Sequence, residues 1–134
     1  MNVFEYKVIK HSWGIRIVFE LDEQKGTFQD NSIKINDSFY VTITKIQPLT
    51  DRQKWYIIKA FELVSQNIKI EKNDVLNIII NKLIYSYTDF QEEGLFCGIV
   101  QWAASYYQFQ APKFEVDFNT KINKYIFSNI PLYK

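Results

Sequence analysis

The sequence is poor in the residues that most often carry chemistry, with one cysteine, one histidine and four glycines in 134 residues. A single cysteine cannot form an internal disulfide, so no bridge between cysteines holds the fold together. One cysteine and one histidine are also too few for a zinc site. The four glycines form no phosphate-binding loop and no dinucleotide fingerprint. We therefore predict no metal site and no cofactor.

The chain also lacks an excess of either charge, since it has 16 basic and 15 acidic side chains and a net charge of +1. Proteins that bind phosphate groups usually carry a basic excess, and proteins that imitate nucleic acids carry an acidic one. The balance therefore argues against a nucleic-acid partner. Apolar residues make up 47% and aromatic residues 17% of the chain, which is enough for the core of one domain spanning residues 1–134.

No run of residues is apolar enough to predict a membrane span. The uncharged stretch at 94–112 contains Gln101, Ser105 and two further glutamines, which the centre of a bilayer would penalise. The first ten residues alternate polar and apolar side chains, unlike the continuous apolar run of a signal peptide. We therefore expect a cytoplasmic protein without a membrane partner.

The first third of the chain alternates apolar and polar residues with a period of two, which is typical of half-buried strands. Phe4, Tyr6 and Val8 mark the first strand, and a tight connection at 11–14 leads to a second strand at 15–21. Further strands are predicted at 33–35, 39–46, 75–85, 114–118 and 122–127. The strand at 75–85 is apolar on both faces, as in the centre of a sheet.

Two helices are predicted from the pattern Thr-Asp-x-Gln, which occurs at 50–53 and again at 88–91. Threonine at the N-cap with glutamine three residues later forms a capping box. The apolar stripe of the first helix extends to Ile68, and the second helix continues to about Gln110. Because a strand precedes each helix, the chain contains a repeated strand–helix unit. We predict an α+β fold with a single-layer mixed or antiparallel sheet, both helices on one face, and a split β-α-β arrangement.

The second predicted helix is the main candidate for a binding site. It carries no charge between Glu93 and Lys113, so it is either buried on several sides or covered by a partner. Tyrosine and tryptophan are enriched at protein interfaces, and acidic side chains steer basic partners. The candidate partner-binding residues are Tyr85, Tyr87, Asp89, Glu92, Glu93, Trp102, Tyr106 and Tyr107. The alternative is that these aromatic side chains form only core and rim.

The side chains that could catalyse a reaction do not form a recognisable set. His11 is the one available base for a catalytic triad, and it lies beside Ser12 in a predicted hairpin turn, where we expect no catalytic role. Cys97 lies inside the apolar helix, where a thiol is usually inert packing. We predict no catalytic residue, and an enzyme built from acidic residues, tyrosine and His11 ranks as the third alternative.

Residues 76–106 resemble part of the fourth domain of elongation factor G, which has the ribosomal-protein S5 domain 2-like fold. The shared features are an isoleucine-rich strand followed by Tyr87, Asp89, a glutamate at 92 or 93, and Phe96. The GTPase motifs and basic loop tips of that family are absent from the sequence. The resemblance therefore implies a split β-α-β arrangement and no function.

The chain is also similar in type to the immunity proteins that bacteria encode beside polymorphic and contact-dependent toxins. Such proteins are often single cytoplasmic α+β domains without catalytic motifs. The hypothesis is therefore a non-enzymatic bacterial protein that binds another protein and neutralises a toxin by occluding it. The alternative is an S5-like RNA-binding module that uses sheet aromatics and lysines. A homo-oligomer also stays open, because self-association could cover the apolar helix.

Overall fold

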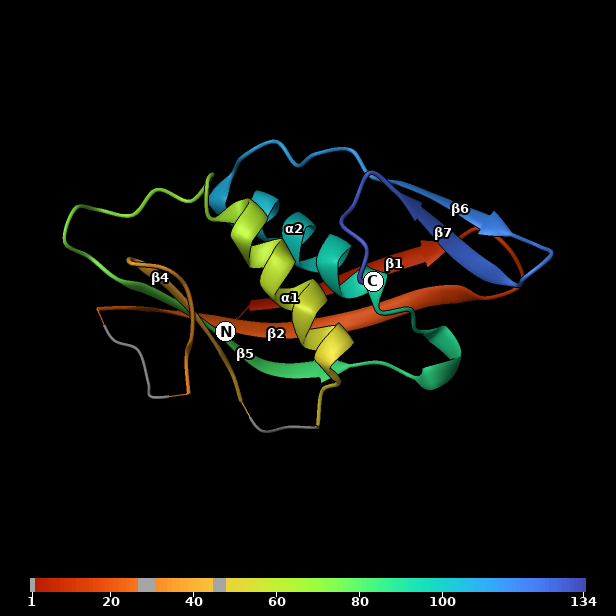
Figure 1. The fold of residues 1–134 in the computed structure, drawn as a ribbon, viewed down its shortest axis with the longest axis horizontal. Coiled ribbons are helices and arrows are strands. Elements are labelled where there is room, and N and C mark those ends of the chain that lie inside the picture. Colours follow the sequence, from red (N-terminus) through yellow and green to blue (C-terminus); the bar gives the residue numbers. More distant parts are fainter. Residues whose placement is uncertain (1, 27–30, 45–47) are drawn as a thin grey trace.

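The computed structural model describes residues 2–26, 31–44 and 48–134, and the strands and two helices follow one another in the predicted order (Figure 1). Residues 45 and 46 of the predicted strand 39–46 lie outside the described residues. The strands are β1 (Asn2–Ile9), β2 (Gly14–Lys25), β3 (Ile33–Asn36), β4 (Phe39–Ile43), β5 (Leu76–Ile84), β6 (Glu115–Asn119) and β7 (Lys124–Ser128). The helices are α1 (Asp51–Val64), the short 3-10 helix η1 (Tyr87–Asp89) and α2 (Glu93–Tyr107).

Five strands form one mixed sheet in the order β1-β2-β5-β4-β3. β4 and β5 are parallel, because α1 carries the chain back between them, and the other neighbouring pairs are antiparallel. β5 occupies the centre of this sheet, and its residues from Leu76 to Ile80 are all buried. The predicted α+β class and the central position of this strand are confirmed.

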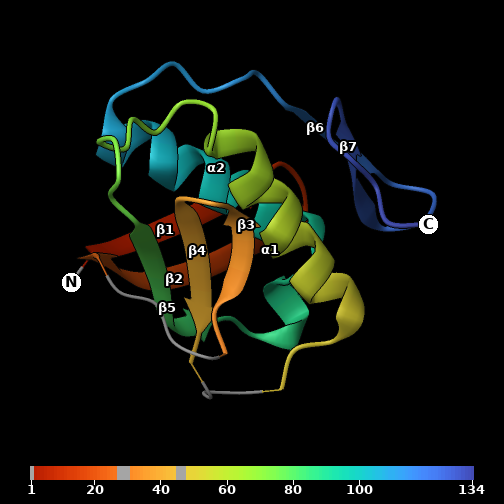
Figure 2. The same ribbon diagram turned by 60° about the vertical axis from the view of Figure 1, so that its left-hand side comes forward.

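Both helices cover the same face of the five-stranded sheet (Figure 2). Alternate residues of β2 are fully buried on that face, namely Ile15, Ile17, Phe19 and Leu21. α2 approaches β2 closely because Gly98 has no side chain. A β-carbon at Gly98 would stand only 2.5 Å from a ring carbon of Phe19. At this point the backbone of α2 packs directly against the Phe19 ring.

The first helix begins as the sequence predicts. The Thr50 hydroxyl accepts a hydrogen bond from the backbone N–H of Gln53 at 3.1 Å, and the Gln53 side-chain carbonyl accepts one from the backbone N–H of Thr50 at 2.9 Å. The capping box at 50–53 is therefore confirmed. The helix ends at Val64, and Ile68, which was predicted to extend its stripe, is buried in the segment that follows.

The second predicted capping box is wrong. Helix α2 begins at Glu93 instead of Thr88, and its N-cap residue makes no side-chain capping bond. The Gln91 side chain, which should have closed the box, pairs with the backbone of Tyr125 instead. It accepts from the Tyr125 N–H at 2.7 Å and donates to the Tyr125 carbonyl at 3.0 Å. An amide held in this way cannot also cap the helix.

The predicted end of the second helix is also too late. α2 ends at Tyr107, and Gln108 adopts a left-handed conformation with φ of 58°. A left-handed residue stops a helix because the next backbone groups no longer follow the helical path. The segment that includes Gln110 is therefore outside the helix.

The last two predicted strands, β6 and β7, form a separate two-stranded sheet and do not join the single predicted layer. This hairpin lies beside the turn between β1 and β2 (Figure 1). Tyr125 of β7 is buried and links the two. Its hydroxyl donates to the carbonyl of Trp13 at 2.5 Å and accepts from the N–H of Lys10 at 2.9 Å. The hairpin is therefore fixed to the sheet by side-chain contacts.

Candidate functional site

The eight predicted partner-binding residues lie at the two ends of α2 and do not form one surface. Tyr85, Tyr87, Asp89, Glu92 and Glu93 lie before or at its N-terminus. Trp102, Tyr106 and Tyr107 lie in its last turns. The helix has 15 residues, which corresponds to about 22 Å at 1.5 Å per residue. The two groups are therefore separate candidate sites.

The group at the C-terminal end of α2 is a packed aromatic cluster. Trp102 is buried and its ring stacks on Tyr106, with 5.4 Å between the ring centroids. Tyr107 packs edge-on against both rings, at 6.0 Å from Trp102 and 4.9 Å from Tyr106. Tyr106 is 41% exposed. We refer to Trp102, Tyr106 and Tyr107 as the aromatic end.

Tyr107 is held in place by β2. Its hydroxyl donates a hydrogen bond to the carboxylate of Glu23. Burial raises the pKa of Tyr107 above its ordinary value, and the hydrogen bond to Glu23 raises it further. The Tyr107 hydroxyl therefore remains a proton donor at neutral pH.

A cavity of about 400 Å³ opens beside Tyr106 and Tyr107. Ile68 and Leu76 supply apolar lining, and both are buried. Charged side chains also border it, namely Glu23, Lys25, Lys69, Glu71 and Asp74. Five of the eleven lining residues are charged, so the cavity is more polar than the largely apolar pockets that bind small molecules.

The group at the N-terminal end of α2 contains a second set of aromatic rings. Tyr85 stacks on Phe90 with 4.0 Å between the centroids, and Tyr87 packs edge-on against Tyr85 at 6.1 Å. The Tyr87 side chain is 91% exposed, so most of its ring lies in solvent. Unlike Tyr106, it does not line the cavity of about 400 Å³ described above.

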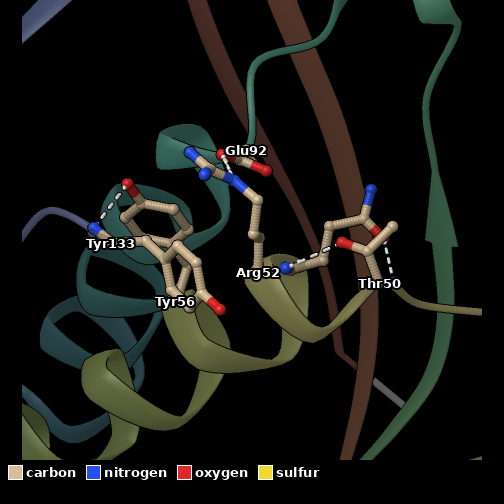
Figure 3. Close-up of polar contacts among 6 residues, drawn as sticks. Thr50, Arg52, Tyr56, Glu92 and Tyr133 are labelled. Carbon is tan, nitrogen blue, oxygen red and sulfur yellow. Dashed lines mark hydrogen bonds and ion pairs between the residues drawn. The ribbon is translucent and has the colours of Figure 1, made fainter.

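The acidic side chain of Glu92 is used inside the molecule. Its carboxylate lies 2.6 Å from the Nε of Arg52 and joins the start of α2 to the first turn of α1 (Figure 3). The Arg52 guanidinium lies 4.8 Å from the centroid of the Tyr133 ring. The backbone N–H of Tyr133 in turn donates to the Tyr56 hydroxyl at 3.2 Å (Figure 3). Glu92 therefore links α2 to α1 through its ion pair with Arg52.

The two other acidic residues have different surroundings from Glu92. Glu93 is partly buried, and this burial raises the pKa of its carboxyl, with a further contribution from neighbouring Glu92. Asp89 borders a second cavity of about 300 Å³, together with His11 and Lys7. Glu92 is thus in an ion pair, Glu93 is partly buried and Asp89 borders a cavity. The three carboxylates do not form one exposed acidic patch.

The sequence argument missed the residues that organise both ends of α2. Arg52 and Glu23 are the partners of predicted site residues, yet they lie far from them in the sequence. The capping motif at 50–53 contains Arg52 but gives no sign of its partner, because a contact across 40 residues depends on how the helices pack. The cavity beside Tyr106 has the same origin, since a segment after α1 forms part of its wall.

The two residues considered for catalysis lie in different surroundings. His11 is in the exposed turn, where its ring stacks on Phe118 at 4.6 Å, and its Nδ1 lies 3.3 Å from the Ser12 hydroxyl. Cys97 is buried within α2, and burial is the main reason that the pKa of its thiol rises to about 12. The Cys97 thiol is therefore protonated at neutral pH and is not activated as a nucleophile.

Within residues 2–26, 31–44 and 48–134, histidine, cysteine and acidic side chains do not gather in groups of three or more that could hold a metal ion. No helix in the same part of the chain is long and apolar enough to cross a membrane. Comparison of the chain with protein-family models, curated proteins and solved structures found no match. The function is therefore argued from the site itself.

Proposed function

We propose that this protein binds another protein through the aromatic end of α2 and catalyses no reaction. We further propose that the partner is a bacterial toxin, which the protein occludes in the cytoplasm. The observation that carries the proposal is the partly exposed ring of Tyr106 beside a cavity of about 400 Å³. An aromatic anchor beside a cavity is a typical arrangement at the centre of a protein interface.

The aromatic end is preorganised for such a role. Tyr106 stacks on the buried ring of Trp102, and Tyr107 is fixed by its hydrogen bond to Glu23. Ordering a side chain on binding costs about 0.5–1.5 kcal/mol, and this cost is smaller when the ring is already held. The exposed part of Tyr106 can therefore contact a partner with little further loss of conformational freedom.

The RNA-binding alternative requires basic groups that are available to phosphates. On the sheet face opposite the helices, Arg16 pairs with Glu5 at 2.7 Å, and Lys82 lies 3.7 Å from Glu20. Basic groups paired in this way gain less from phosphate contacts, because an ion pair must first be broken. We therefore favour a protein partner and treat RNA as an outcome of the test.

The test begins with capture of partners from the native host on the tagged full-length chain, with and without nuclease. We expect one stoichiometric protein that survives nuclease treatment, stops growth when it is expressed alone, and becomes harmless when it is co-expressed with this chain. Loss of all captured material on nuclease treatment would support the RNA-binding alternative. A captured protein that is harmless alone would overturn the toxin proposal.

The captured complex then tests the position of the site. Tyr106→Ala should raise the dissociation constant by about 30-fold, because a central aromatic anchor contributes about 2 kcal/mol. Tyr87→Ala is the matched control, since it removes an exposed tyrosine from the other end of α2. Equal affinity of Tyr106→Ala and the unchanged chain, measured by calorimetry, would exclude the aromatic end as the binding site.

A further inference from the structure

The outer edge of β1 has no partner strand among the described residues. β1 is the first strand of the five-stranded sheet, and β2 is its one neighbour there (Figure 2). β6 and β7 pair with each other in a separate sheet. The backbone N–H and C=O groups of such an edge form a template that another strand can pair with.

The turn after β1 indicates which backbone groups point outward. The Tyr125 hydroxyl bridges the N–H of Lys10 and the carbonyl of Trp13, which are the turn residues next to the last β1–β2 pair, Ile9 and Gly14. The Lys10 N–H therefore points toward β2, and backbone groups alternate in direction along a strand. The residues whose backbone groups point to the outer edge are then Val3, Glu5, Lys7 and Ile9.

The side chains of these four residues also suit a partner. Val3 and Ile9 are apolar but 64% and 63% exposed. Lys7 lies directly opposite Arg16 on β2, so two like charges face each other across the strands. Arg16 is neutralised by Glu5 at 2.7 Å, whereas Lys7 has no ion pair with a described residue. The edge thus presents exposed apolar groups at both ends and one uncompensated cation.

We propose that a second copy of this chain covers this edge, with the two β1 strands antiparallel about a two-fold axis at Tyr6. Glu5 then lies opposite Lys7 of the second copy, and Val3 lies opposite Ile9. Because the axis repeats each contact, the dimer contains two such charge pairs and two such apolar pairs. The two five-stranded sheets become one continuous sheet.

Other registers of the two strands are less favourable. A shift of two residues in one direction places Glu5 opposite Glu5, and a shift in the other direction places Lys7 opposite Lys7. Like charges directly opposite each other are destabilising. A shift of one residue sets outward-pointing backbone groups against inward-pointing ones and breaks the ladder. The charges therefore select one alignment and disfavour open-ended association.

The test measures the oligomeric state of the full chain by sedimentation equilibrium from micromolar to millimolar concentration. We expect a monomer–dimer equilibrium for the unchanged chain. Lys7→Glu places acidic groups opposite Glu5 on both halves of the dimer and should weaken dimerisation by about tenfold or more. The monomer should still fold, because the new carboxylate faces Arg16. Lys121→Glu makes the same change of charge in the β6–β7 turn and should leave the dimer unchanged.

A charge exchange makes the test specific. Glu5→Lys should weaken dimerisation as Lys7→Glu does, whereas an equimolar mixture of the two variants should form a heterodimer, since one edge is then acidic and the other basic. The double variant Glu5→Lys/Lys7→Glu should regain the homodimer and provides a second check if Glu5→Lys alone folds poorly. A monomeric unchanged chain at millimolar concentration, undiminished dimerisation of Lys7→Glu, or failure of both exchange arms would overturn the proposal.

The edge of β1 and the aromatic end of α2 share no residue. Tyr106→Ala should therefore leave the dimer unchanged, and Lys7→Glu should leave binding of a protein partner unchanged. The two proposals consequently succeed or fail independently of each other.

Discussion

At the scale of single residues, Gly98 sets the distance between α2 and the sheet. A β-carbon there would stand 2.5 Å and 2.7 Å from two atoms of the buried Phe19 ring, which is rigid and must move as a whole. In Gly98→Ala, overpacking should cost about 1–3 kcal/mol and the better helix propensity should return about 1 kcal/mol, so we expect a net destabilisation of up to about 2 kcal/mol. Urea denaturation of the variant measures this change.

Gly94 provides the matched comparison. A β-carbon at Gly94 would stand 2.9 Å from the terminal Cδ1 of Ile17, which can rotate away. We therefore expect Gly94→Ala to cost less stability than Gly98→Ala. A larger loss for Gly94→Ala would contradict the view that the Phe19 ring limits the approach of the helix.

The carboxyl of Glu93 gives the fold a pH dependence. Burial raises the pKa of this carboxyl above its ordinary value of 4.5, so the charged form is less stable in the folded chain than in the unfolded chain. The Glu93 carboxyl therefore contributes stability at low pH that is lost as pH rises above 4.5, whereas Glu93→Gln has no such contribution to lose. The stability of the variant relative to the unchanged chain should therefore increase as pH rises above 4.5.

Denaturation at a series of pH values measures the difference in the free energy of unfolding between the two proteins. The contributions of the titratable groups that they share cancel in this difference. Glu115→Gln, at an exposed position of β6, serves as the control. A difference between Glu93→Gln and the unchanged chain that shrinks as pH rises would show that the buried carboxylate is stabilised by its surroundings.

At the scale of elements, one amide holds the β6–β7 hairpin against the start of α2. Gln91→Ala removes both hydrogen bonds to the Tyr125 backbone, at 2.7 Å and 3.0 Å, and leaves that N–H and C=O without this partner. We expect a loss of about 1–3 kcal/mol in the free energy of unfolding. Gln101→Ala, on the exposed side of α2, is the control. Equal stability of the two variants would show that the hairpin is held by its aromatic contacts instead.

The two copies of Thr-Asp-x-Gln show how far sequence predicts the elements. At 50–53 the motif caps α1, because the Gln53 side-chain oxygen accepts from the Thr50 N–H at 2.9 Å while its nitrogen lies 3.5 Å from the Tyr85 hydroxyl, so the two contacts use different atoms. At 88–91 only Thr88 and Asp89 belong to a short 3-10 helix, and the Gln91 side chain binds the backbone of a strand 34 residues later. Alternation and local capping are readable from the sequence, whereas a competing partner in the tertiary structure is not.

At the scale of the whole molecule, the sequence predicted which residues belong to the candidate site, but the structure divides them between the two ends of α2. The prediction grouped Tyr87 with Tyr106 because both flank one apolar helix, but the straight helix separates them by its own length. The cavity depends on how the segment after α1 lies against the end of α2. The sequence could therefore suggest that aromatic residues bind a partner, but the packing of the segment after α1 determines which of these residues lie beside a cavity.

The molecule also consists of two parts that differ in the packing that stabilises them. The five-stranded sheet packs against two helices around buried residues such as Phe19 and Ile80, whereas β6 and β7 form a two-stranded sheet of their own. Two-stranded ribbons are marginally stable alone and open locally. Native-state hydrogen exchange should therefore be faster at Asp117 and Ile126, which pair with each other in the hairpin, than at Phe19 and Ile80. Equal protection at all four amides would mean that the hairpin unfolds only with the rest of the chain.

The hydroxyl of Tyr125 has a consequence for the order in which the chain acquires its structure during synthesis. This atom fills the gap between Lys10 and Trp13, so the turn between β1 and β2 is completed by a residue more than a hundred positions later in the chain. Until that tyrosine has been synthesised, these two backbone groups of the turn remain open to water. The β1–β2 turn therefore reaches its final form only after β7 has been translated.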